Sequence, residues 1–379
     1  MTILRSERFA AVLLVLAAVA GLVLANSAAA PFALAAEAFH FGIPAVGLDL
    51  SLGHWVKDGL LAIFFFIAAI ELRHELSHGE LNSPAKALVP TVAAIGGVIV
   101  PAVLFLVLVR DPDLAQGWPI PTATDIAFAL GVLAIVGKGL PPKFRALLLA
   151  LAVIDDLIAI LIIAAFFTSN LAPLPLLIAV PVVLLFGWLS YRVARSRWVI
   201  AALVALGVAA WVLVFLSGIH PTIAGVTLGL LMAGSSAAKT RHAIEPWSNA
   251  VILPLFALTA ALVPIATASV AQLSPAFWAV LVALPVGKLV GITAGALIAM
   301  AVSRDRRNRL PLGDVIAIAG LGGIGFTVSL LMNELAYSAQ QDVAHEVTLA
   351  VLIASVIAAV IGGALTAVRS RHYRMSAAT

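Results

Sequence analysis

The sequence predicts an all-α polytopic membrane protein of about twelve transmembrane helices. Of its 379 residues, 63% are hydrophobic and only 11% are charged, and the mean hydropathy is +1.14. Soluble globular domains are about 45–50% apolar and about 25% charged, so this chain has more apolar surface than water tolerates. The length accommodates about twelve apolar segments of roughly 20 residues with short connections. We therefore expect a single membrane transport domain over 1–379 and exclude a cytosolic enzyme.

Apolar segments follow one another along the whole chain. The first comes after basic residues, as in a signal peptide, but its apolar run is too long for a typical signal sequence, so we interpret it as a retained span. The eighth segment is the shortest. The predicted spans are 8–28, 56–78, 84–109, 114–136, 142–168, 172–191, 197–217, 221–234, 247–264, 276–302, 313–335 and 345–368.

The connection 29–55, between the first two spans, is the longest one expected outside the cell. Apolar residues alternate with Gly47, Asp49 and Ser51 over its second half. Alternation with a period of two is typical of a strand or a hairpin, and an irregular loop is the other interpretation compatible with the sequence.

Basic residues indicate the topology. With the N-terminus inside and twelve spans, 19 Lys and Arg residues fall at inner ends, while only Lys57 and Arg110 fall outside and Lys288 lies within a span. This asymmetry obeys the positive-inside rule and predicts that both termini are cytoplasmic. The inner set is Arg5, Arg8, Arg73, Lys86, Lys138, Lys143, Arg145, Arg192, Arg195, Arg197, Lys239, Arg241, Arg304, Arg306, Arg307, Arg309, Arg369, Arg371 and Arg374. Because these residues are dispersed over seven segments, the pI of about 9.7 does not indicate nucleic-acid binding.

Four ionisable residues lie where the bilayer centre is expected: Asp125, Asp155, Asp156 and Lys288. Each such charge costs at least about 2.5–3.5 kcal/mol when it has no compensation. A salt-bridge network that holds helices in register is the structural interpretation. Three carboxylates, however, outnumber one ammonium, and excess carboxylate at this depth favours a cation or proton site. Asp155 and Asp156 point about 100° apart on one helix, so one can face Lys288 while the other faces water.

Two predicted spans contain sequences that suit a continuous helix poorly. The fourth includes 119–125 (PIPTATD), and the eleventh includes 320–327 (GLGGIGFT). Close packing through small residues is the alternative explanation for the glycines. If spans 3–5 and 10–12 are inverted repeats, the two interruptions are equivalent and cross at the midplane, as in secondary transporters. Asp125 and Lys288 would then offset the partial charges of the interrupted helix ends.

Other functions fit these residues less well. An intramembrane aspartyl protease needs its two carboxylates on facing helices, and an anion or solute carrier needs an excess of cationic groups. A nucleotide-driven pump needs a Gly-rich phosphate loop ending in Lys-Ser/Thr, which the sequence lacks. The chain also lacks cysteine, which excludes thiol metal sites and Cys nucleophiles. We expect a secondary transporter without a cofactor.

Five stretches, in this order, give the sequence a specific resemblance to the NhaA-type sodium/proton antiporters. They are 123–131 (ATDIAFALG), 152–157 (AVIDDL), 217–225 (SGIHPTIAG), 287–288 (GK) and 323–327 (GIGFT). The resemblance implies electrogenic exchange of Na⁺ or Li⁺ for H⁺ in the plasma (inner) membrane, which regulates intracellular pH and Na⁺. It also implies a homodimer joined through a hairpin in 45–52.

The same resemblance assigns roles to single residues. Asp156 would be the principal carboxylate for Na⁺ and H⁺, with Asp155 beside it and paired with Lys288, while Thr124 and Asp125 would lie at the break of the fourth span. A set of candidates for a pH response comprises Glu71, Arg73, His74, Glu75 and His220. For His220, a hydrogen-bonded structural residue is the alternative.

Two departures from the family pattern stand in or near the ninth span. The stretch 256–262 (FALTAAL) lacks the Asn and Gly of the family's FAFANAG-like sequence. Arg241 precedes His242 where the family usually has an acidic residue. The first departure concerns contacts of that span, and the second concerns the pH at which transport is activated.

Overall fold

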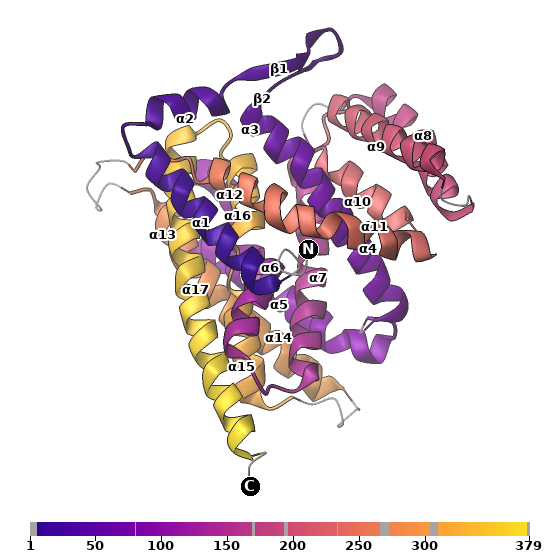
Figure 1. Ribbon diagram of the computed structural model, residues 1–379. Coiled ribbons are helices and arrows are strands. Elements are labelled where there is room, and N and C mark those ends of the chain that lie inside the picture. The colour runs from indigo at the N-terminus through magenta and orange to yellow at the C-terminus, as the bar shows by residue number, and fades with distance from the viewer. Residues whose placement is uncertain are drawn as a thin grey trace.

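The protein is a helical assembly with one small antiparallel sheet at one end (Figure 1). The structure, a computed structural model, describes residues 6–79, 81–168, 171–192, 196–232, 234–265, 273–303 and 310–376. Six residues of the predicted inner set lie outside the described residues: Arg5, Arg195, Arg304, Arg306, Arg307 and Arg309.

The elements run in chain order as follows. The α-helices and strands are α1 (Glu7–Ala25), α2 (Ala30–Glu37), β1 (His40–Ile43), β2 (Leu48–Ser51), α3 (Leu52–His54), α4 (Leu61–His78), α5 (Pro84–Leu108), α6 (Ile126–Val136), α7 (Pro142–Phe166), α8 (Pro173–Arg192), α9 (Arg197–Leu216), α10 (Thr222–Leu231), α11 (Gly234–Trp247), α12 (Leu253–Ala260), α13 (Pro275–Val282), α14 (Lys288–Val302), α15 (Leu312–Gly322), α16 (Phe326–Ala336) and α17 (Gln341–Ser376). Shorter 3₁₀ turns are η2 (Pro44–Val46), η4 (Pro112–Gly117) and η5 (Ile120–Thr122), and π-helical turns are η3 (Trp55–Leu60), η6 (Ser248–Ile252) and η8 (Ala283–Gly287).

Length and composition make this a multi-pass membrane protein. Among the described residues, eight helices are long and apolar enough to cross a membrane, or up to ten if each of two bent helix pairs forms one span. The helix that contains the predicted ninth span begins before residue 247, because α11 starts at Gly234 and continues through η6 into α12. Pro246 lies inside that helix and does not end it, and a π-helical turn follows directly.

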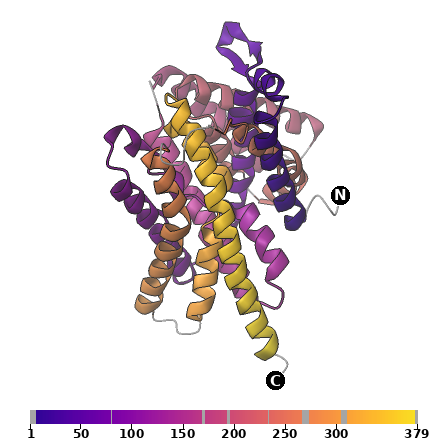
Figure 2. The ribbon, with the colours of Figure 1, turned by 90° about the vertical axis from the view of Figure 1, so that its left-hand side faces the viewer.

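The helices pack as two groups (Figures 1 and 2). One group, here called the α17 unit, contains α5, α6, α7 and α13 to α17, with α5 packed on α14 and both α13 and α15 packed on α17. The other, the α4 unit, contains α2, the sheet, α4 and α8 to α12, with α4 packed on α10 and α8 packed on α9. Contacts of α4 with α7 and of α12 with α16 join the units, and α1 contacts both α6 and α12.

The connection between the first two spans contains both a helix and a hairpin. Strand β1 pairs antiparallel with β2, with His40 opposite Ser51 and Ile43 opposite Leu48. The alternating residues therefore form the second strand, while the first strand and α2 come from a stretch without that pattern. The hairpin lies at the end of the molecule opposite the C-terminus, here called the hairpin end (Figure 1).

Helices α5 and α14 approach so closely that glycine is required at their crossing. A Cβ atom on Gly291 would collide with the backbone carbonyl of Gly96, and one on Gly96 would collide with the carbonyl of Gly291. Backbone atoms cannot move aside as a flexible side chain can. This crossing fixes α14, which carries Lys288, relative to α5.

We therefore expect Gly291→Ala to lower the thermal midpoint of the detergent-purified protein. Over-packing of a tight contact costs about 1–3 kcal/mol, and the collision here is with backbone. Gly207→Ala on α9 is the matched control, because a Cβ there meets only Leu228 Cδ1 at an ordinary 3.8 Å. Equal midpoints for the two variants would contradict the assigned packing.

Candidate ion-binding site

Two helix pairs are interrupted at the places where the sequence suits a helix poorly. The chain bends by 44° between 112–122 and 126–136, and by 47° between Gly322 and Phe326. In the first pair, Pro119 and Pro121 lack donors for helical bonds and Ala123 is extended. In the second pair, glycines separate α15 from α16, and a Cβ on Gly325 would crowd Leu284 at 2.7 Å and the carbonyl of Ala123 at 3.1 Å.

The two interruptions bind each other. The backbone N–H of Asp125 donates to the carbonyl of Ile324 at 2.6 Å, and Thr124 Oγ1 donates to the carbonyl of Gly322 at 2.7 Å. Ser329 Oγ donates to the carbonyl of Ile120 at 2.7 Å. Each break thus supplies partners for backbone groups that the other leaves without a helical bond.

Asp125 caps two helices at once. Its Oδ1 accepts from the N–H of Phe128 at 2.9 Å, which makes it the N-cap of α6. Its Oδ2 accepts from Thr327 at the start of α16, from Oγ1 at 2.8 Å and from the N–H at 3.2 Å. A carboxylate is favoured at a helix N-terminus, where the partial charge is positive. The expectation that Asp125 offsets helix ends therefore matches its contacts.

Lys288 pairs with Asp155 on the neighbouring helix α7. The Nζ atom lies 2.5 Å from Asp155 Oδ2, and the two side chains are 0% and 1% exposed. Lys288 is the first residue of α14, directly after the π-helical turn η8, which contains Pro285. Because proline cannot donate the helical bond, the wider turn accommodates it and sets the direction in which Lys288 points. The pairing of Lys288 with Asp155 that the resemblance implies is present. The prediction that Lys288 also offsets a helix end stays a prediction.

Asp156 is buried beside the pair but is not bound to Lys288. Among the described residues, Asp155 Oδ1 and Asp156 Oδ1 are buried and have no hydrogen-bond partner. The charges that act on Asp156 are those of Asp155, Asp125, Lys288 and Glu71. Buried carboxylate oxygens without donors are costly unless a proton or a cation joins them. Their oxygen chemistry suits a hard cation such as Na⁺.

The candidates for a pH response lie at two separate places. Glu71, Arg73, His74 and Glu75 lie near the C-terminal end of α4, whereas His220 lies near its other end and faces Asp58, with Nε2 3.4 Å from Oδ1. The 13 residues from Asp58 to Glu71 cover roughly 20 Å along the helix, so the two places are well separated. His220 Nδ1 is also 2.7 Å from Thr222 Oγ1, so its contacts match the structural alternative.

Residues at both departures from the family pattern make polar contacts. Arg241 Nη1 lies 3.1 Å from Glu71 Oε1, which ties α11 to α4. Thr259, within 256–262, donates to the carbonyls of Leu255 and Phe256 in its own helix, each at 3.1 Å. The threonine hydroxyl is therefore satisfied locally.

Sequence reasoning did not single out Thr327 and Ser329 as site residues. Both are buried, and both bind the opposite break rather than their own helix. The sequence signal for these two residues is a hydroxyl in the first turn after a glycine-rich interruption. That signal does not identify the partner, because the partner depends on how two distant segments cross.

We expect Asp125→Ala to lower the thermal midpoint more than Asp125→Asn. Loss of one N-cap costs about 0.5–2 kcal/mol, and alanine removes the acceptor for both helices, while asparagine keeps one oxygen. Differential scanning of the purified variants measures this. A midpoint for Asp125→Ala equal to that of the unsubstituted chain would mean that the caps contribute nothing.

The chain is also similar to known proteins along nearly its whole length. The model of the Na⁺/H⁺ antiporter 1 family matches residues 1–366. The chain is similar to Na⁺/H⁺ antiporter NhaA 2 of Clavibacter michiganensis, with 52% identity over 100% of this chain and 94% of that protein. It is also similar to NhaA of Tropheryma whipplei, with 43% identity over 95% and 94%, and to NhaA 3 of Streptomyces coelicolor, with 44% identity over 98% and 80%. Antiporters are secondary transporters and not enzymes. The chain therefore belongs to the Na⁺/H⁺ antiporter 1 family.

Proposed function

We propose that this chain exchanges Na⁺, or Li⁺, for H⁺ across the inner membrane of the cell. The observation that carries the proposal is the buried set of three carboxylates with one ammonium, in which Asp155 and Asp156 each keep an oxygen without a donor. One carboxylate site holds a proton or a cation but not both. Competition between them, combined with access from alternate sides, gives coupled exchange.

The two interrupted helix pairs support a transport cycle with alternating access. We propose twelve spans, in which α4 and α10 are added to the ten that length and composition give. Spans 3–5 and spans 10–12 form inverted repeats, and their two breaks cross at the midplane. Both termini are cytoplasmic. In such a cycle one helical unit moves against the other around the site. Asp155, Asp156, Asp125 and Lys288 all belong to the α17 unit, and contacts between α4 and α7 lie along its boundary.

A homodimer through the hairpin is part of the same proposal. Phe39, Phe41 and Ile43 are 64%, 43% and 60% exposed, and β1 is one of two edge strands. An exposed apolar edge strand is a template for pairing with a second chain. The proposed pH response places Glu71 and its neighbours at the inner face, with Arg241 neutralising Glu71 and altering the activating pH.

Asp156→Asn should abolish exchange while the protein stays folded. Asparagine keeps the shape of the side chain but removes its charge and its titration. Proteoliposomes with an imposed proton gradient and a series of alkali cations measure the rate, and the thermal midpoint reports folding. Asp342→Asn, an exposed position at the start of α17, is the control and should exchange normally. Normal transport by Asp156→Asn would refute the site assignment.

Lys288→Gln should exchange one proton per Na⁺ and become insensitive to membrane voltage. Exchange of two protons for one Na⁺ needs a second proton carrier, and we propose that Lys288 releases its proton when Na⁺ occupies Asp155 and Asp156. Exchange measured with and without a potassium diffusion potential tests this. If the folded variant still transports electrogenically, Asp155 carries the second proton and Lys288 is a structural counter-ion.

A further inference from the structure

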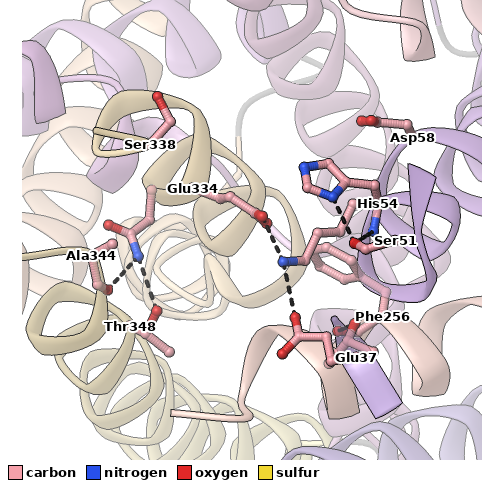
Figure 3. Close-up of polar contacts among 12 residues, drawn as sticks. Glu37, Ser51, His54, Asp58, Phe256, Glu334, Ser338, Ala344 and Thr348 are labelled. Carbon is pink, nitrogen blue, oxygen red and sulfur yellow. Dashed lines mark hydrogen bonds and ion pairs between the residues drawn. The ribbon is translucent and has the colours of Figure 1, made fainter. Parts of the chain in front are cut away.

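A second lysine joins the two helical units at the hairpin end of the molecule. Lys57 Nζ lies 2.5 Å from Glu334 Oε1 and 3.4 Å from Glu37 Oε1. Lys57 and Glu37 belong to the α4 unit, on η3 and α2, whereas Glu334 belongs to the α17 unit, on α16. In Figure 3, Glu334 and Glu37 approach the same amine from opposite sides. The Lys57–Glu334 ion pair, here called the Lys57 tie, therefore crosses the boundary between the units.

The two carboxylate partners of Lys57 differ in packing and in exposure. Glu37 packs over the backbone of Gly53, where a Cβ would lie 2.9 Å from its Cγ and Oε1 atoms. Its contact with Lys57 stays within the α4 unit. Glu334 is the more exposed partner, at 35% against 22% for Glu37 and 16% for Lys57. Lys57 thus has one partner within its own unit, Glu37, and a closer but more exposed partner across the boundary, Glu334. Exposure lets water replace the contact with Glu334 when the units separate.

Helix α16 connects the tie to the ion site. Its first turn holds Thr327, which donates to Asp125, and its last turn holds Glu334. A displacement of the α17 unit against the α4 unit moves both together, because they lie on one continuous helix of 11 residues. Helices α12 and α16 also contact each other across the boundary. The tie is a polar contact that must break when the units separate at this end.

We propose that the Lys57 tie acts as a gate at the hairpin end. The ion pair is formed while that side of the protein is closed, and it breaks when the ion site opens to that side. The inference rests on the proposed exchange, since a gate requires alternating access. An ion pair suits this role because a half-buried pair contributes little net free energy and can form and break in each cycle. Water solvates both partners once they separate.

Reversible cross-linking tests the gate, and the absence of native cysteine makes the background clean. Lys57→Cys/Glu334→Cys chains in proteoliposomes are treated with a short bifunctional methanethiosulfonate. We expect exchange to stop on treatment and to return when a reductant cleaves the linker. The single cysteine variants, treated in the same way, should keep their rates. So should Glu37→Cys/Lys57→Cys, in which the linker joins two segments of one unit.

Side-specific kinetics provide a second measurement that does not depend on linker formation. Lys57→Met and Glu334→Gln remove the tie and should raise the population open at the hairpin end. The KM for Na⁺ presented from that side should fall about two- to fivefold, and the KM from the other side should rise, with total turnover retained. Lys57→Arg keeps the positive charge between Glu334 and Glu37 and should retain both values of the unsubstituted chain. An ion pair that only stabilises the fold would change the thermal midpoint but leave the KM value on each side unchanged.

The outcomes separate this inference from the proposed function. Undiminished exchange by linked Lys57→Cys/Glu334→Cys chains, or KM values unchanged on both sides in the tie variants, overturns the gate while antiport stands. Absence of Na⁺-dependent proton movement by the unsubstituted chain in the same vesicles overturns the antiport proposal itself.

Discussion

The candidate ion site contains one buried ammonium and three buried carboxylates, and the rest of the structure depends on this imbalance. Lys288 pairs with Asp155 at 2.5 Å, and both are removed from solvent. Asp125 is stabilised by donors from two helix ends. Asp156 lies beside the pair, and its buried Oδ1 has no hydrogen-bond partner among the described residues. In the proposed function a proton or a cation supplies the missing compensation. The proposed exchange at this site rests on that unmatched carboxylate oxygen.

The two helix interruptions are stable because each completes the other. A break in a membrane helix exposes backbone donors and acceptors that lipid cannot satisfy. Here Thr124 and Ser329 donate to carbonyls across the breaks, while Asp125 accepts from the N-terminal turns of α6 and α16. The unwound segments are consequently fixed relative to each other. Motion during transport is then expected at the boundary between the α4 and α17 units rather than within the crossing.

Ion pairs at the two ends of α4 join different partners. Near its C-terminal end, Arg241 binds Glu71 within the α4 unit, at the place where the family usually has an acidic residue. Just before α4 begins, Lys57 binds Glu334 of the α17 unit. The first changes the local charge near the candidate pH-response residues, and the second links the units. A substitution that is neutral for the fold can thus alter regulation at one end and access at the other.

The sequence by itself determined the membrane class, most span positions, the two interruptions and the four ionisable residues that the bilayer cannot accommodate. These follow from local composition: hydropathy, the missing N–H of proline, and the cost of a charge in lipid. Only the tertiary structure decided the partners. Helix periodicity placed Asp155 and Asp156 on different faces, but the packing of α5 on α14 and the π-helical turn before Lys288 selected Asp155 as its partner. The partners of three residues, Thr327, Ser329 and Glu334, lie roughly 200 or more residues away in the sequence. No local sequence pattern predicts these partners, because side-chain contacts between distant segments depend on how whole helices cross.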